Sequence, residues 1–216
     1  VKDLIFCLAT LDIPTMSKLI SVILTGGKSS RMGHENKSFL KFNNKNFIEI
    51  LTNSLKEKSD EIIINANRDI QKYEELGYRV VKDKIEGYKG PLAGLHSALD
   101  LYKNKDEDLW FALFPTDAPI INTKLIDIFL SISKKNNNAY ISKINNIIEP
   151  MFSFWSLKIY KNLENVLLNN DGYKIMKFAD EIGFDFVNFT KDKKVEFFNV
   201  NDKDDYTEFL SFRETN

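Results

Sequence analysis

Apolar blocks alternate along the chain with segments of helical spacing, and this alternation predicts an α/β fold. Four mostly apolar blocks lie at residues 19–25, 61–66, 78–82 and 109–115, and the first three contain β-branched residues. Such blocks are typical of buried strands, whereas the segments between them carry apolar residues at helical spacing. Short connections between strands and helices favour right-handed βα units. We therefore expect a Rossmann-like, three-layer architecture with a largely parallel (mixed) sheet and helices on both faces.

The second half of the chain carries a weaker pattern. Two strands, at residues 139–144 and 147–155, are predicted on either side of an Asn145-Asn146 turn and would form a hairpin-like insertion. The remaining predicted elements are helices at 157–168 and 173–182, short strands at 184–189 and 195–200, and a terminal helix at 202–212 capped by Asp202.

Glycines and cations follow the first predicted strand. The loop holds the glycines and positive or hydroxyl side chains Gly26, Gly27, Lys28, Ser29, Ser30, Arg31, Gly33 and Lys37. Backbone N–H groups freed by glycine, together with cationic side chains, suit a polyphosphate. The spacing matches neither a Walker loop nor the GxGxxG dinucleotide fingerprint. We expect a nucleoside triphosphate site here; the alternative is a Gly/Ser turn with solvated charges.

Polar residues also follow the other three strands of the first half. Asn65, Asp83 and Asp117 each stand at or just after a strand end. Ligands of open α/β sheets bind at the carboxyl ends of strands, so these side chains are candidates for one common site. Taken singly, Asn65 and Asp83 fit equally well as turn formers, because Asn and Asp bond to nearby backbone.

Asp117 is the candidate metal ligand. Its alternative role is to cap the helix expected near Asn122, but Asn122 and Thr123 can cap that helix themselves. Mg²⁺ is usually held by one or two carboxylates together with phosphate oxygens and waters. The two histidines offer no competing site, because His34 has no acidic partner nearby in the sequence and His96 is expected to pack within a helix.

Charge and cysteine content narrow the function classes. Thirty basic and 31 acidic residues give a net charge of −1, which argues against nucleic-acid and membrane-surface partners. A single cysteine, Cys7, excludes an internal disulfide and fits the reducing cytoplasm. The apolar run at residues 4–11 is too short to cross a bilayer and lacks the features of a secretory signal. We expect residues 1–15 to be an extension outside the fold and residues 16–216 to form one domain.

Taken in order, these motifs resemble a known family. The loop LTGGKSSRMG with Lys37 resembles the nucleotidyltransferase pattern LAGGxxxRMGxxK, with Thr25 in place of alanine. Together with NANR, Asp83, GPLAG, TDAP and FFNVNDKDD, it resembles the molybdenum cofactor guanylyltransferase family over nearly all of residues 19–212. Thr116 stands where this family frequently has cysteine, and Ile148-Glu149-Pro150 where it often has His-Pro. The resemblance implies a nucleotide-diphospho-sugar-transferase-like fold, so that residues 16–216 would be a single nucleotidyltransferase domain.

The resemblance also implies the reaction and its residues. GMP would pass from GTP to molybdopterin with release of pyrophosphate, in the cytoplasm and with Mg²⁺ on Asp117. Arg31, Lys37 and Asp117 would be the catalytic groups, and Asn199 and Asn201 would line the pterin side or assist the metal. The residues implied to hold the nucleotide are Leu24, Thr25, Gly26, Gly27, Lys37, Asn65, Asp83 and Asp117. Molybdenum cofactor insertion proteins or apo-molybdoenzymes would receive the product.

Three alternatives stay open at this point. A molybdopterin cytidylyltransferase or a sugar-1-phosphate nucleotidyltransferase would share the fold, and the NANR and NVN segments are our reason for preferring guanine. A non-catalytic nucleotide-binding module would keep the site without turnover, but Asp117 and Lys37 are both intact.

Overall fold

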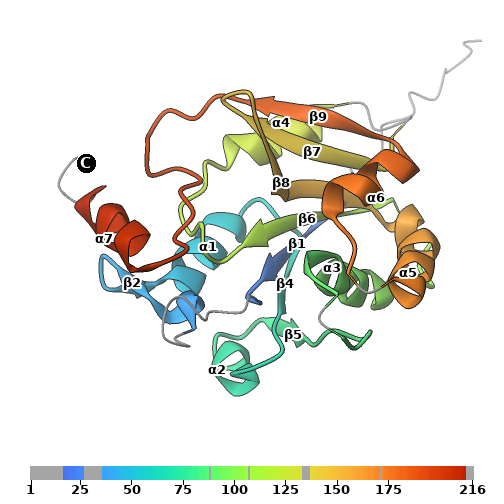
Figure 1. Ribbon diagram of the computed structural model, residues 1–216, viewed down its shortest axis with the longest axis horizontal. Helices are drawn as coiled ribbons and strands as arrows, with labels where there is room; N and C mark the ends of the chain where they lie inside the picture. The colour runs from blue at the N-terminus through green and yellow to red at the C-terminus, as the bar shows by residue number, and fades with distance from the viewer. Residues whose placement is uncertain are drawn as a thin grey trace, which may run out of the picture.

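A single mixed sheet with helices on both faces forms the protein (Figure 1). The computed structural model describes residues 17–26, 36–87, 89–106, 108–132, 137–170 and 172–212. The strands are β1 (Lys18–Leu24), β2 (Lys41–Phe42), β3 (Lys45–Asn46), β4 (Glu61–Asn65), β5 (Arg79–Val81), β6 (Leu109–Pro115), β7 (Ala139–Ile144), β8 (Ile147–Ser156) and β9 (Phe184–Phe189). The helices are η2 (Lys37–Phe39), α1 (Phe47–Leu55), α2 (Ile70–Glu74), α3 (Pro91–Asp100), α4 (Lys124–Ser131), η3 (Leu157–Ile159), α5 (Tyr160–Asn169), α6 (Ile175–Ile182) and α7 (Lys203–Ser211).

The main sheet has the order β5-β4-β1-β6-β8-β7-β9. Its first four strands are parallel, as the sequence predicts, so their carboxyl ends share one edge. Strand β8 runs antiparallel to both β6 and β7, and β9 is parallel to β7. The predicted hairpin around Asn145 and Asn146 is confirmed, and both turn residues have positive φ. It is an integral part of the sheet, because β8 pairs directly with β6.

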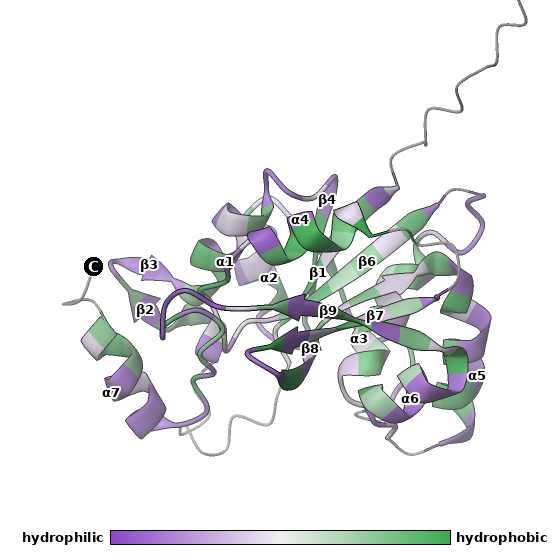
Figure 2. Cartoon of the chain, turned by 90° about the horizontal axis from the view of Figure 1, so that it is seen from above, coloured by the Kyte–Doolittle hydropathy of each residue, from purple (hydrophilic) through white to green (hydrophobic). Residues whose placement is uncertain are grey.

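Two apolar layers enclose the sheet (Figure 2). Alternate residues of β1 face opposite sides: Leu19 and Ile23 belong to the core under α1 and α4, whereas Ile20, Val22 and Leu24 belong to the core under α3, α5 and α6. This alternation is what a strand buried on both faces requires. A third, smaller core packs α7 on α1 and the β2–β3 hairpin.

One predicted strand, at residues 195–200, is wrong. The segment forms turns, and Phe197 has a φ of 58°, which no strand residue adopts. Its backbone bonds to the chain after β6, since Phe197 N donates to Ile120 O and Val200 N donates to Asp117 O, each at 2.8 Å. Val195 and Val200 are buried by packing in the third core, so their apolar character reflects tertiary contacts and not a sheet.

The helices in the second half of the chain begin and end close to the predicted residues. Asp202 caps α7 as predicted, accepting from the backbone N–H groups of Asp204 and Asp205 at 3.0 Å. The predicted helix at 157–168 opens with the 3-10 turn η3 before α5 begins. Residues 1–15 fall outside the described part of the chain, so the predicted division into extension and domain stays a prediction. Within the described ranges, no helix combines the length and apolarity needed to cross a membrane.

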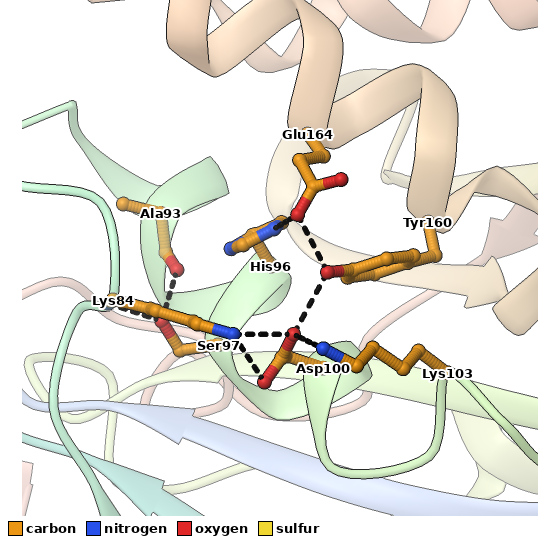
Figure 3. A network of polar contacts seen from close by, with 8 residues as sticks. All are labelled: Lys84, Ala93, His96, Ser97, Asp100, Lys103, Tyr160 and Glu164. Atoms are coloured by element: carbon orange, nitrogen blue, oxygen red, sulfur yellow. Dashed lines mark hydrogen bonds and ion pairs between the residues drawn. The ribbon is translucent and has the colours of Figure 1, made fainter.

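A polar network joins α3 to α5 on one face of the sheet (Figure 3). His96 of α3 is 1% exposed and stacks on Tyr160 of α5, with ring centroids 5.2 Å apart. The Tyr160 hydroxyl lies 2.7 Å from both Asp100 Oδ1 and Glu164 Oε1. The packing role expected for His96 is therefore confirmed.

Candidate active site

The carboxyl ends of β1, β4 and β6 lie side by side at one edge of the sheet. Leu24 is in register with Asn65 on one side and with Pro115 on the other. The ladder continues past the strands, since Thr25 N donates to Asn65 O and Thr116 N donates to Leu24 O, both at 3.1 Å. The structure thus brings together the predicted site residues Leu24, Thr25, Gly26, Asn65 and Asp117.

Asp83 is held by two asparagine side chains. Asn65 Nδ2 donates to Asp83 Oδ1 at 2.9 Å, and Asn67 Nδ2 donates to Asp83 Oδ2 at 2.8 Å. Asp83 N returns a bond to Asn67 Oδ1 at 2.9 Å. The carboxylate is therefore fixed in orientation beside the end of β4. Asn67 is not among the residues predicted for the site; the signal that could have found it is the second asparagine of NANR, two positions after Asn65.

Gly94 allows α3 to lie directly against this edge. Helix α3 begins after Gly90, which has a φ of 76°, and Pro91 occupies its first turn. A Cβ at position 94 would lie 2.4 Å from Asn65 Oδ1 and 2.6 Å from Leu24 Cδ2, closer than real contacts permit. Only glycine fits there without a shift of the site. The GPLAG motif marked this segment in the sequence, but not the reason for its second glycine.

Asp117 follows β6 and is mostly enclosed. Burial raises the pKa of its carboxyl above the ordinary value, and the positive charge of Lys37 offsets only part of this shift. Lys37 and Asp117 come from segments far apart in the sequence, but the charge of Lys37 acts on the Asp117 carboxyl. Asn122 Oδ1 accepts from Lys124 N at 3.1 Å at the start of α4, so Asp117 is not needed as a cap.

Lys37 stands at the start of η2, whose geometry is set by Asn36. Asn36 Oδ1 accepts from Ser38 N at 3.2 Å. The Asn36 amide donates to Asp69 Oδ2 at 2.9 Å and to the Tyr73 hydroxyl at 3.0 Å. This anchor fixes the backbone from which Lys37 extends.

The segment with Asn199 and Asn201 passes beside Asp117. Val200 lies between the two asparagines and donates its backbone N–H to Asp117 O at 2.8 Å. Asn199 is half-buried and Asn201 is exposed. Both predicted residues are thus within one position of a direct contact with the metal candidate. Gly27 and Arg31, the remaining predicted site residues, lie outside the described part of the chain, as does His34.

The donor set at this edge fits only certain cations. The described ranges contain no group of three or more histidine, cysteine or carboxylate side chains that could enclose a metal. At the end of β6 Asp117 offers one carboxylate, so a cation held by Asp117 needs its other ligands from phosphate and water. Mg²⁺ binds in this manner, whereas structural zinc requires a closed set of protein ligands.

Comparisons with known proteins agree with this geometry. Residues 21–182 match the family described as the MobA-like NTP transferase domain. A probable molybdenum cofactor guanylyltransferase of Clostridium perfringens strain 13 is 33% identical over 92% of this chain and 100% of its own length. The molybdenum cofactor guanylyltransferase of Vibrio atlanticus is 31% identical, over 87% of this chain and 93% of its own.

A solved structure shares the fold. The molybdopterin-guanine dinucleotide biosynthesis protein A of Archaeoglobus fulgidus superposes with a TM-score of 0.72, covering 91% of this chain and all of that one at 19% identity. The expected three-layer fold with a largely parallel, mixed sheet is therefore confirmed. The family match extends from Ser21 in β1 to Ile182 in α6 and includes Asn65, Asp83 and Asp117.

Proposed function

The chain belongs to the MobA-like NTP transferase family, and from this membership we propose that it transfers GMP from GTP to molybdopterin and releases pyrophosphate. It is a nucleotidyltransferase whose curated relatives match nearly their whole length. The observation that supports the assignment of the site is the convergence of Leu24, Asn65 and Asp117 at the edge where β1, β4 and β6 end, with the charge of Lys37 acting on the Asp117 carboxyl. A cation and a carboxylate in one place suit a triphosphate with its bound metal.

The transfer itself requires no nucleophile from the protein. A phosphate oxygen of molybdopterin attacks the α-phosphorus of GTP, the bond to the bridging oxygen breaks, and pyrophosphate leaves with the electron pair. Catalysis then depends on alignment of the two substrates and on neutralisation of phosphate charge. We assign Lys37 and Arg31 to the phosphates. Thr25, Gly26 and Gly27 have small side chains or none, so we assign their backbone N–H groups to the phosphates as well.

Asp117 is the proposed ligand of the metal. Asp117 directly follows β6, its backbone oxygen accepts a hydrogen bond from Val200 N, and its carboxyl is mostly enclosed. We propose Mg²⁺ as the cation; when bound, it would neutralise charge on the phosphates. Asn199 and Asn201 remain proposed contacts of the pterin side or of the metal.

Asn65 and Asp83 are the proposed nucleotide-holding pair. A carboxylate accepts two parallel N–H groups at once, and guanine presents an imino and an amino N–H side by side. Cytosine presents only an amino group with acceptors next to it. The fixed carboxylate of Asp83 therefore favours guanine over cytosine, and Leu24 supplies an apolar wall beside it.

The test is pyrophosphate release from Mg-GTP, with Mg-CTP in parallel, in the presence of molybdopterin. We expect release with GTP and a guanine dinucleotide product by mass spectrometry. Faster turnover of CTP would favour the cytidylyltransferase alternative, and transfer only to a sugar 1-phosphate would favour that class of enzyme. GTP binding without release would indicate a non-catalytic module. Delivery of the product to insertion proteins or apo-molybdoenzymes in the cytoplasm belongs to the same proposal.

A further inference from the structure

A buried chain of hydrogen bonds runs beneath the proposed phosphate and metal residues. Ser38 Oγ donates to Thr116 Oγ1 at 3.1 Å, and Thr116 Oγ1 donates to the backbone oxygen of Leu24 at 3.4 Å. Ser38 is fully buried and Thr116 is 4% exposed. Hydroxyl groups taken out of water need such partners, so loss of one member leaves another unsatisfied.

Each residue in this series of hydrogen bonds lies next to a proposed site residue in the sequence. Ser38 follows Lys37 and Thr116 precedes Asp117, while Leu24 ends β1 just before the glycine loop. Residues 38 and 116 are 78 positions apart in the sequence, so no local structure relates them. Since neighbouring Cα atoms are about 3.8 Å apart, fixing Ser38 against Thr116 also fixes the origins of the Lys37 and Asp117 side chains.

Other contacts anchor the two charged residues separately. Asn36 anchors the start of η2 to Asp69 and Tyr73, which belong to the segment after β4. Asp117 is anchored by the strand ladder of β6 and by Val200. Within the described part of the chain, the Ser38–Thr116 bond joins η2 directly to the end of β6.

We propose that Ser38 and Thr116 are positioning residues that hold the Lys37 ammonium and the Asp117 carboxylate at their working separation. The inference rests on the proposed function, because it concerns the same phosphate and metal groups. Neither hydroxyl touches the substrate; both act through the neighbouring residue. Alignment errors near 1 Å reduce the rate far more than they reduce ground-state binding, so the loss is expected in kcat.

The experiment compares Ser38→Ala, Thr116→Val and the double variant with the unmodified protein. We expect each single variant to lower kcat for GMP transfer by about 10-fold with KM for GTP changed less than 3-fold. The double variant should lose little more than either single one, because both remove the same bond. Thr116→Ser keeps the hydroxyl and should retain most of the activity.

Ser21→Ala is the matched control. Ser21 is a fully buried hydroxyl of β1 that lies 2.6 Å from the Ser59 hydroxyl, and Ser59 precedes β4 at the opposite edge of the sheet. Its removal tests the effect of losing a buried hydroxyl and its hydrogen bond on the same strand. We expect wild-type kcat in Ser21→Ala, and an equal loss there would overturn the positioning role.

A second measurement needs no turnover. Crystal structures of the variants give the distance between Lys37 Nζ and the Asp117 carboxylate directly. If the Ser38–Thr116 bond sets this distance, it should lengthen in Ser38→Ala and Thr116→Val but not in Ser21→Ala. An unchanged distance together with wild-type kcat would overturn the inference. A longer distance in a protein without GMP transfer would uphold the positioning role and reject the proposed function.

Discussion

The side-chain amide of Asn65 donates a hydrogen bond to the carboxylate of Asp83 across 2.9 Å. The bond ties the end of β4 to the chain just after β5, and Asn67 Nδ2 donates to the second carboxylate oxygen. Each oxygen of a carboxylate has more than one acceptor site, so Asp83 can still receive donors from a ligand. If Asp83 binds the nucleotide as proposed, these two bonds order its carboxylate in advance and reduce the entropy lost on binding.

Asp83→Asn should weaken the discrimination between nucleotides. The replacement amide retains one acceptor but turns a donor toward Asn65 or Asn67, so one of the two supporting bonds is lost. We expect kcat/KM for GTP to fall by about 10- to 100-fold, because hydrogen bonds to charged groups contribute about 1.5–3 kcal/mol. The value for CTP should change much less. Steady-state pyrophosphate release with both nucleotides measures the effect, and parallel losses would contradict a role in base choice.

Gly94→Ala should destabilise the protein in spite of its position in a helix. Alanine improves helix propensity over glycine by about 1 kcal/mol. Its Cβ would nevertheless overlap Asn65 Oδ1 and Leu24 Cδ2, and such overpacking costs typically about 1–3 kcal/mol. We therefore expect a lower free energy of unfolding in urea and weaker GTP binding by calorimetry. A more stable variant with unchanged binding would show that α3 does not constrain the site.

The double variant Gly94→Ala with Asn65→Ala separates the two effects. Removing the Asn65 amide relieves the closest overlap, so the stability lost in Gly94→Ala should be partly restored. GTP affinity should stay low, because the bond to Asp83 is gone. Recovery of both properties together would contradict the proposed role of Asn65.

The parallel half of the sheet could be predicted because its signals are local. The β-branched blocks of β1 and β4 leave no helical interpretation, and polar residues at strand ends mark the edge where ligands bind. Asn65, Asp83 and Asp117 are predicted as site residues in this way, and their roles stay a prediction. The motif spacing of the loop then identified the kind of ligand.

The remaining features depend on contacts between distant segments. Val195 and Val200 look like strand residues because burial, whatever its source, selects apolar side chains. The need for glycine at position 94 arises from the approach of α3 to Asn65, which no neighbouring residue encodes. The Ser38–Thr116 bond joins two ordinary hydroxyl residues, and a sequence gives no reason to pair them.

Asp117→Asn should abolish transfer without harming the fold. Loss of the anionic ligand should lower kcat by about 100-fold or more, as expected for charge stabilisation in a transition state. The folded-state pKa of Asp117 is raised, so its neutral form is favoured by folding. The protonated carboxyl contributes to the free energy of unfolding. This contribution is fully present below the pKa of the unfolded state and is lost as the pH rises through the pKa of the folded state. At pH 7 the variant should therefore be at least as stable as the unmodified protein.

Urea unfolding at pH 7 and pH 5 checks this sign. The stability advantage of Asp117→Asn should be largest at pH 7 and should shrink on acidification. Asp127→Asn is a suitable control, because Asp127 of α4 is an exposed carboxylate that forms an ion pair with Lys58. It should change neither transfer nor stability by more than about 0.5 kcal/mol. Wild-type turnover in Asp117→Asn would remove the metal role.

The α3–α5 network predicts a different pH dependence (Figure 3). Burial lowers the pKa of His96, although the carboxylates of Glu164 and Asp100 oppose this shift and the charge of Lys84 adds to it. Glu164 Oε1 lies 3.6 Å from the His96 Nε2 atom. The Tyr160 hydroxyl has one proton for two carboxylate neighbours, and its own pKa is raised by burial and by both of them. His96 is thus held neutral in the folded protein near pH 7.

Acidification should unfold the wild type more readily than His96→Phe. The unfolded histidine, with a pKa near 6.5, binds a proton before the folded one, so stability is complete above that value and is lost as the pH falls through the folded pKa. The loss can reach about 1.4 kcal/mol per pH unit. Phenylalanine keeps the stacking on Tyr160 but cannot titrate, so its unfolding free energy should change less between pH 7 and 5. NMR titration is direct because the chain has only two histidines; a His96 pKa above 6.5 would contradict the neutral state and reverse the sign of the effect.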